Sequence, residues 1–291
     1  MPVLPSHLPA SVIANPPHAI VGIIRFSLLL HESNFFPPLS GQPYEERKAR
    51  IFDPLRLRRR FDIFEQVCLP SLTGQSDPNF NVILATSRDL PDWAHQRLAG
   101  LVHSLPNIYV RAYRPQANIQ RIYRRSALEM TDQAAPITAT FRLDDDDALA
   151  RGYVTRLRTH MQPENIGKTV TFSNGCQLVL SDRELQAWID TRSNGSAGLA
   201  LIQRGGIATI PEISTIYCLG GHRKVGQLAP QIDDPMPQSY VQTANGYNVT
   251  SRRGMGGSDV ASAPDLASQL RANFPYLDAG TLAGLHEVFD D

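Results

Sequence analysis

Four consecutive aspartates, Asp144 to Asp147, are the residues of this sequence best suited to chemistry. Neighbouring carboxylates repel one another, so the cluster is costly unless a cation or several hydrogen-bond donors compensate its charge. Hard divalent cations such as Mg²⁺ and Mn²⁺ prefer oxygen ligands and readily bridge a diphosphate. Because alternate residues of an extended strand face the same side, Asp144 and Asp146 are predicted to bind such a cation together.

A solvated acidic turn is the alternative interpretation of the four aspartates. In a related version of it, Asp147 caps the next helix and interacts favourably with the helix dipole. The preceding residues favour the metal site, because apolar and polar residues alternate from Ile137 to Leu143 and predict a buried strand that runs directly into Asp144. Ligands of open α/β sheets bind at the carboxyl ends of strands, which is where the cluster falls.

The elements that must position the cluster follow an α/β pattern, in which short apolar runs alternate with amphipathic stretches from Ala19 onwards. Pro70 is expected to stop the helix predicted at residues 61–68, and Thr86-Ser87-Arg88 is expected to form a polar turn. Strands are predicted at residues 20–26, 81–85, 108–110 and 137–143, and helices at 61–68, 92–103, 119–130 and 153–160.

Beyond Gly167 the pattern changes. Residues 169–172 and 177–180 are predicted to form a β-hairpin around an Asn174-Gly175 turn. A further strand is expected at 197–203, and from Tyr217 loops are expected to dominate. A short apolar helix is predicted near Leu282.

Composition bounds the class of protein. The 291 residues are 42% hydrophobic and 19% charged, as in ordinary globular proteins, and 28 basic residues balance 28 acidic ones. This balance argues against a dedicated nucleic-acid binder. Three widely spaced cysteines predict neither a zinc site nor a disulfide framework, so a reducing cytoplasm is the expected compartment. No apolar run approaches the ~20 residues of a membrane span.

The acidic stretch from Phe141 to Leu149 resembles the acidic motif of the family known as "putative rhamnosyltransferase", a group of bacterial GT-A-type glycosyltransferases. The resemblance extends over about residues 20–255. Shorter stretches in the same order support it: Ile24 to Ser27, Cys68 to Leu72, Asn79 to Leu84, Phe172 to Gly175, Gly221 to Val225, Tyr240 to Gln242 and Asn248 to Arg252.

The resemblance implies a GT-A-like (Rossmann-like) fold: an open, twisted, mixed sheet flanked by helices, with a small second sheet. One domain would cover residues 19–251, with a donor half up to about residue 165 and an acceptor half after it. Residues 1–18 would form a flexible segment, and residues 252–291 a C-terminal tail with a short helix.

For the site, the resemblance implies a nucleotide-sugar donor and a bound Mn²⁺ or Mg²⁺. Asp144 would contact the ribose or the metal, with Asp145 beside it at the donor, and Asp146 would bind the metal that bridges the diphosphate. Family members commonly carry a histidine three residues before the position of Asn248, whereas this sequence has Asn245. An asparagine oxygen can still bind either cation, so Asn245 is the predicted third ligand.

Arg25, Arg121 and Arg124 are candidates for contacts with the donor. Arg25 interrupts the first apolar strand, where an unpaired charge is expensive, so its partner is either a ligand phosphate or base, or an internal carboxylate. Arg121 shares a helix face with Arg124 and Arg125; this face points either at phosphates or at solvent.

Two further sets of residues are assigned by position. Thr86, with Ser87, follows the second strand and is a candidate nucleobase contact. The arginine-rich run of residues 56–60 is interpreted as a solvated helix face, with acidic lipid or acceptor glycan as the alternative partner.

An inverting transferase also needs a general base for the acceptor hydroxyl. Asp182 and His222 are the primary candidates, and His222 follows two glycines in a stretch suited to a loop at the site. Glu212, Asp233 and Asp234 are further candidates. Each of these residues could equally be an ordinary polar residue of the surface.

The predicted function is therefore transfer of a hexose from a nucleotide sugar to a glycan or glycolipid hydroxyl, such as an acceptor of a cell-envelope polysaccharide. Contact with a lipid-linked acceptor would be peripheral, at the inner membrane. One alternative is a sugar-phosphate nucleotidyltransferase, although the glycine-rich basic loop expected after its first strand is replaced by Ser27-Leu28-Leu29-Leu30. The other alternative is a non-catalytic nucleotide- or glycan-binding protein.

Overall fold

The structure is a computed structural model that describes residues 18–30, 41–180, 185–190, 195–205, 215–245 and 263–287. The strands are β1 (Ile20–Arg25), β2 (Asn81–Ser87), β3 (Ile108–Tyr113), β4 (Ile137–Asp144), β5 (Ala148–Leu149), β6 (Thr169–Phe172), β7 (Gly175–Leu180), β8 (Leu185–Asp190), β9 (Ala200–Arg204), β10 (Gln231–Asp234) and β11 (Tyr240–Asn245). The α-helices are α1 (Tyr44–Ile51), α2 (Pro54–Ile63), α3 (Leu69–Thr73), α4 (Asp92–Val102), α5 (Ile119–Met130), α6 (Tyr153–His160), α7 (Val225–Leu228), α8 (Ala263–Leu270) and α9 (Ala279–Glu287).

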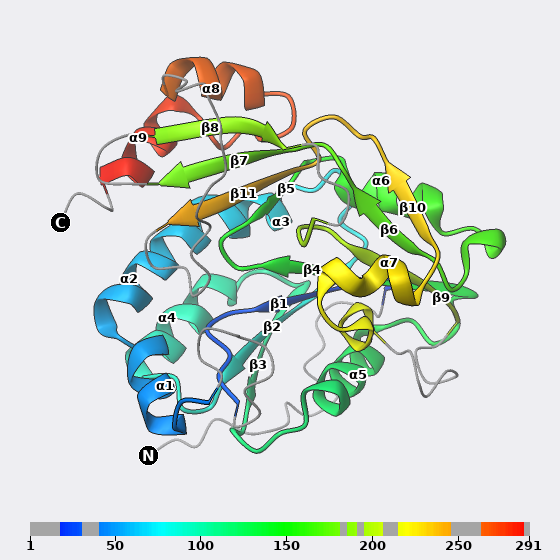
Figure 1. The fold of residues 1–291 in the computed structure, drawn as a ribbon, viewed down its shortest axis with the longest axis horizontal. Helices are drawn as coiled ribbons and strands as arrows, with labels where there is room; N and C mark the ends of the chain where they lie inside the picture. Colours follow the sequence, from blue (N-terminus) through cyan, green and yellow to red (C-terminus); the bar gives the residue numbers. More distant parts are fainter. Residues whose placement is uncertain are drawn as a thin grey trace.

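The central layer is a seven-stranded mixed sheet in the order β10-β6-β9-β4-β1-β2-β3 (Figure 1). Strand β9 runs antiparallel to both of its neighbours, and the other neighbouring pairs are parallel. The predicted α/β class is confirmed, and α5 and α6 cover the ranges predicted for them.

Helices cover both faces of the large sheet. Apolar residues of α1 to α4 and α6 pack with one face of β1, β2 and β4. The other face packs against α5, the 3-10 helix η6 (Ile216–Leu219) and α7. Consequently, alternate residues of β4 lie in different surroundings: Phe141 and Leu143 belong to the first core, while Arg142 and Asp144 face the second layer.

The predicted hairpin of residues 169–180 is wrong, because its two strands belong to different sheets. Strand β6 pairs with β9 and β10 in the large sheet, whereas β7 pairs with β8 and β11 in a four-stranded sheet of order β5-β11-β7-β8. The crossing is fixed by Tyr240, whose ring covers Gly175 so closely that an added Cβ would lie 2.2 Å from it. Gly175 is thus required by close packing and not by a hairpin turn.

Pro70 does not end the helical region, contrary to the prediction. The chain continues from α2 through the π-helical turn η3 (Phe64–Cys68) into α3, and Pro70 lies at the start of α3. In this wider turn the Leu69 N–H donates to the Phe64 carbonyl, five residues earlier in the chain. The regular α-helical hydrogen-bond pattern is therefore already interrupted where Pro70 enters, and its ring does not have to break it.

The small sheet has its own apolar layer, formed with α8 and α9 on one side (Figure 1). Leu266, Leu270, Leu282 and Leu285 pack with side chains of β7 and β11, and the predicted helix near Leu282 is confirmed as α9. The division of the chain at residues 18 and 251 stays a prediction. Among the described residues, no helix combines the length and apolarity that a bilayer crossing needs.

Candidate functional site

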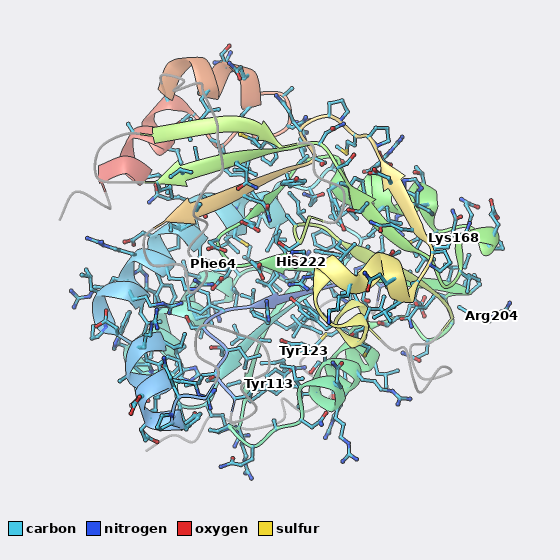
Figure 2. The ribbon with its side chains drawn as sticks, in the orientation of Figure 1. Phe64, Tyr113, Tyr123, Lys168, Arg204 and His222 are labelled. Atoms are coloured by element: carbon cyan, nitrogen blue, oxygen red, sulfur yellow. The ribbon has the colours of Figure 1, made fainter. Side chains whose placement is uncertain are left out.

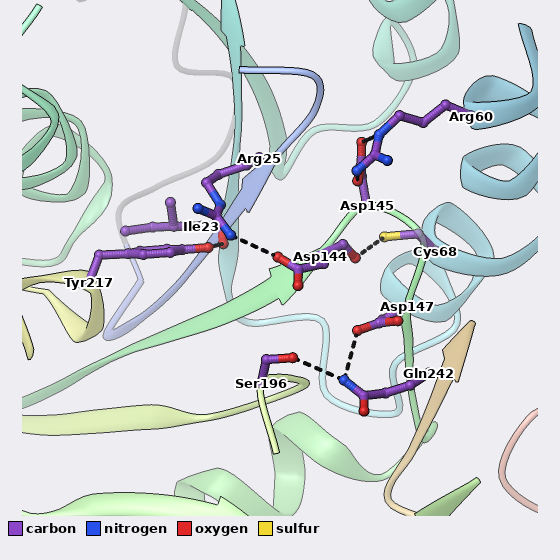
Figure 3. A network of polar contacts seen from close by, with 10 residues as sticks. All are labelled: Ile23, Arg25, Arg60, Cys68, Asp144, Asp145, Asp147, Ser196, Tyr217 and Gln242. Atoms are coloured by element: carbon purple, nitrogen blue, oxygen red, sulfur yellow. Dashed lines mark hydrogen bonds and ion pairs between the residues drawn. The ribbon is translucent and has the colours of Figure 1, made fainter. Parts of the chain in front are cut away.

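The four aspartates form the junction between the two sheets. Strand β4 of the large sheet ends at Asp144, the Asp147 N–H donates to the Asp144 carbonyl at 3.1 Å, and β5 of the small sheet starts at Ala148. Asp145, Asp146 and Asp147 are all buried, so the turn is not the solvated acidic loop of the alternative interpretation. Figure 3 shows that the side chains of Asp144, Asp145 and Asp147 point in different directions.

Asp144 is held by an arginine of the neighbouring parallel strand. Arg25 and Asp144 are partners in the β1–β4 register, and the Arg25 Nη2 donates to Asp144 Oδ1 at 3.2 Å (Figure 3). Burial by itself raises the pKa of Asp144, but Arg25 and Arg142 outweigh burial and lower this pKa to about 2. Arg25 therefore has an internal carboxylate partner, Asp144, and its contact with the donor stays a prediction.

Asp145 forms a two-point ion pair with Arg60 of α2. The Arg60 Nε donates to Asp145 Oδ2 at 2.6 Å, and its Nη2 makes a second, shorter contact with Oδ1. The interpretation of residues 56–60 as a solvated face is wrong, because Arg56 and Arg59 are buried as well and only Arg58 is exposed among the four arginines. That interpretation failed because the fold packs α2 against the acidic turn.

Asp147 is held by strand β11 of the small sheet. Its carboxylate accepts from the Gln242 Nε2 and from the Thr243 N–H, both at 3.1 Å. The Thr243 hydroxyl donates to the Asp146 carbonyl at 2.7 Å, and Gln242 also reaches Ser196 at 2.9 Å. The helix-cap interpretation of Asp147 is wrong, since α6 begins after Gly152 without a side-chain cap.

The carboxylate of Asp146 differs from the other three, because no other side chain of the described chain bonds to it. The residue is only 7% exposed. Burial raises the pKa of Asp146 to about 6 in spite of the opposing charge of Arg60. A nearby cation would offset this cost, so the donor set fits a hard divalent metal: Asp146 offers a carboxylate without a protein partner, and Asp144 is ionised two residues away.

The described residues do not provide a complete metal site by themselves. Within them, no three His, Cys, Asp or Glu side chains gather around one point. The predicted third ligand, Asn245, ends β11 in register with Leu180, and its side chain lies outside the description. Two carboxylates with the remaining positions open would suit a cation that also takes oxygens from a diphosphate.

Thr86, Arg121 and Arg124 are also predicted to contact the donor. None of them takes part in the hydrogen bonds and ion pairs described above for the acidic turn. Thr86 lies within β2 and not in a turn, and its buried Oγ1 has no hydrogen-bond partner among the described residues. Ser87 exchanges hydrogen bonds with the backbone of Leu29, at 2.6 and 3.0 Å, which indicates a structural role. On α5, Arg121 is exposed and Arg124 is half-buried, and their roles stay predictions.

The candidate general bases are only partly described. His222 begins the 3-10 helix η7 (His222–Lys224), directly after Gly220 and Gly221, and is half-buried (Figure 2). Asp182 and Glu212 lie outside the described residues. Asp233 is exposed, whereas Asp234 is fully engaged by Arg156 at 2.6 Å and His160 at 2.5 Å.

Sequence reasoning missed the residues that organise the acidic turn: Arg60, Arg142, Tyr217, Gln242 and Thr243. Two signals were available. Arg142 occupies an inward-facing position of an alternating buried strand, and Gln242 ends one of the stretches that carry the family resemblance.

The fold and the acidic turn define a class, an α/β protein with a carboxylate site at the carboxyl end of a central parallel strand. The chain belongs to the glycosyltransferase family described as "Putative rhamnosyl transferase", which it matches over residues 19–257. No curated protein matches the chain.

Solved structures show only distant likenesses. A crystal structure of S. aureus TarS 1-349 has a TM-score of 0.40 at 11% identity, covering 93% of this chain and 70% of that one. A second S. aureus TarS structure has a TM-score of 0.38 at 12% identity and covers 87% and 38%. A "Putative Glucose-1-Phosphate Thymidylyltransferase" from Bacillus anthracis has a TM-score of 0.33 at 10% identity and covers 94% and 96%. Likenesses this distant carry no argument about the site.

Proposed function

We propose that this protein transfers a sugar from a nucleoside-diphosphate sugar to a hydroxyl of a glycan or glycolipid, with Mn²⁺ or Mg²⁺ held on the diphosphate by Asp144 and Asp146. The observation that carries the proposal is the contrast within the acidic turn. Asp145 and Asp147 are bonded to Arg60 and to β11, whereas the buried carboxylate of Asp146 has no bond from another described side chain. A carboxylate in that state is suited to a cation.

Each residue of the turn then has a separate task. The ion pair with Arg25 keeps Asp144 ionised and fixes its direction, and the bonds of Thr243 to the carbonyl of Asp146 and the carboxylate of Asp147 fix the backbone of the turn. A bound divalent cation would neutralise charge that develops on the leaving nucleoside diphosphate. The chain thus orients the carboxylate of Asp144 and holds the backbone of Asp146 before any ligand arrives.

The proposal extends to the transferred sugar and to the base for the acceptor hydroxyl. The description of the family supports rhamnose as the transferred sugar. His222, which follows a pair of glycines, and Asp182 are the proposed bases for the acceptor hydroxyl.

Thermal unfolding tests the proposal. The wild type and Asp146→Asn are each heated with a panel of nucleoside diphosphates, with and without Mn²⁺. One nucleotide is expected to stabilise only the wild type and only with Mn²⁺, by roughly 2.7 kcal/mol at a hundred times its dissociation constant. Asp234→Asn is the matched control, since it also removes a buried carboxylate and should keep the nucleotide effect.

Turnover separates this proposal from its alternatives. Release of nucleoside diphosphate from a nucleotide sugar, dependent on acceptor and metal, is the expected reaction. Binding without any turnover would favour a non-catalytic protein, and pyrophosphate release from a nucleoside triphosphate would favour a nucleotidyltransferase. If no nucleotide changes the melting temperature under any condition, the metal-site proposal fails.

A further inference from the structure

Arg142 of β4 is a buried cation without an anionic partner of its own. The residue is only 6% exposed, and in the described chain its side chain makes neither a hydrogen bond nor an ion pair. Its guanidinium lies over the ring of Tyr217, 4.8 Å from the centroid, and its Nε is fully buried with no acceptor. Such a group is expensive to bury, so its presence calls for a partner that binds from outside the chain.

Tyr217 forms a rigid platform beneath this arginine. Its hydroxyl donates to the Ile23 carbonyl at 3.3 Å (Figure 3), and its own carbonyl accepts from the Gln120 Nε2 at 3.2 Å. The ring also packs against Tyr123 with centroids 4.8 Å apart. Contact with a fixed aromatic ring restricts the motion of the guanidinium, so less order is lost when an acceptor binds.

The charged groups nearest to Arg142 lie on the adjacent strand β1 and at the end of β4. In the register of β1 and β4, Ile23 is opposite Arg142 and Arg25 is opposite Asp144. The Arg25 guanidinium also lies over Tyr217, 5.3 Å from the ring centroid, and its Nη2 donates to Asp144. Two guanidinium groups therefore share one carboxylate at the carboxyl ends of two parallel strands, where ligands of such sheets bind.

We propose that Arg142 is an oxyanion-binding residue and that its ligand is the diphosphate of the nucleotide donor. A guanidinium can donate two parallel hydrogen bonds to a phosphate, which matches the unused donors of Arg142. Asp144 follows two residues later on the same face of the strand, so a diphosphate whose cation rests on Asp144 lies within reach of Arg142. This inference rests on the proposed function for the identity of its ligand.

Inorganic pyrophosphate in EDTA is the probe, because it isolates the arginine from both the metal and the nucleobase. Calorimetric titration should show binding to the wild type that weakens about tenfold or more in Arg142→Gln. Arg142→Lys keeps the charge but loses the two-point fork, so its affinity should fall between the two. Arg58→Gln, which removes an exposed arginine of α2, is the control and should bind like the wild type.

Stability distinguishes a binding role from a structural one. Arg142→Gln removes a buried charge whose side chain makes no hydrogen bond or ion pair in the described chain, so its melting temperature without ligand should equal or exceed that of the wild type. Asp146→Asn should bind pyrophosphate in EDTA at least as tightly as the wild type, so a failed metal site leaves this assay intact. Equal pyrophosphate affinity of the wild type and Arg142→Gln, or no binding by the wild type, would overturn the proposal.

Discussion

Asp146 and Asp234 are both buried carboxylates, but they lie in opposite electrostatic surroundings. Asp234, on the edge strand β10, accepts from Arg156, His160 and the Met236 N–H, and these contacts outweigh burial and lower its pKa. Asp146, in the turn after β4, has no bond from another described side chain, and burial raises its pKa to about 6. The first carboxylate joins α6 to β10, and the second is left open for a ligand.

This difference separates buried charges with a structural role from those that mark a candidate binding site. A buried charge that the fold has already paired contributes to structure, whereas one left without a partner lowers stability until something binds. By this criterion we propose that Asp146 and Arg142 supply opposite charges to one site, whereas Asp234 has a structural role. The four predictions below can break or sharpen the comparison.

The largest effect on stability is expected for loss of the Asp145 carboxylate, which forms the ion pair with Arg60. Asp145→Asn leaves Arg60 buried beside a neutral amide, so the free energy of unfolding should fall by roughly 3–5 kcal/mol. Urea denaturation measures the change. Arg125→Gln is the control, because it breaks an exposed i,i+4 pair with Glu129 and should cost only about 0.3–0.5 kcal/mol. Similar losses in the two variants would contradict the buried pairing.

The largest effect on activity is expected at Asp146. Asp146→Asn should lower kcat by about 10²–10³-fold, because the cation on the diphosphate loses a charged ligand. Initial rates of nucleotide release, measured over a range of Mn²⁺ concentrations, check this. A variant that keeps wild-type rates at low Mn²⁺ would exclude Asp146 as a ligand.

The pH dependence of stability should reveal the same residue. The folded pKa of Asp146 is raised to about 6 from an unfolded value of about 3.9, so its contribution is fully present below pH ~3.9 and is lost as pH rises through 6. Asp146→Asn has no carboxylate to titrate, so its stability does not fall in this way. Between pH 4 and pH 7 the unfolding free energy of Asp146→Asn minus that of the wild type should therefore rise by roughly 2–3 kcal/mol. Denaturation at four pH values, repeated with Mn²⁺, measures it. At pH 7, Mn²⁺ should reduce the difference in unfolding free energy between Asp146→Asn and the wild type.

The smallest of the four effects is expected at the paired carboxylate. Asp234→Asn should cost about 1–3 kcal/mol, since it weakens the hydrogen bonds of Arg156 and His160, and it should leave kcat within a factor of two or so. Loss of Mn²⁺-dependent activity in this variant would break the distinction between the two carboxylates.

Much of the donor half of the fold could be predicted from local pattern. Helices α5 and α6 and strands β1 and β4 lie where periodicity placed them, and the acidic cluster lies at the carboxyl end of β4 as expected. These features depend on the spacing of apolar residues within one segment. The crossing at Gly175 could not be predicted, because an Asn-Gly pair has the same local pattern whether or not Tyr240 lies against it.

The sequence by itself determined that the chain forms an α/β sheet, that four carboxylates end its central strand, and that the chain resembles a glycosyltransferase family. Only the tertiary structure decided which carboxylates are available. The partners that engage three of them are distant in the chain: Arg25 lies 119 residues from Asp144, Arg60 lies 85 from Asp145, and Gln242 lies 95 from Asp147. Four identical side chains carry no local signal of these partners, because each partner is set by packing between segments that meet only in the folded protein.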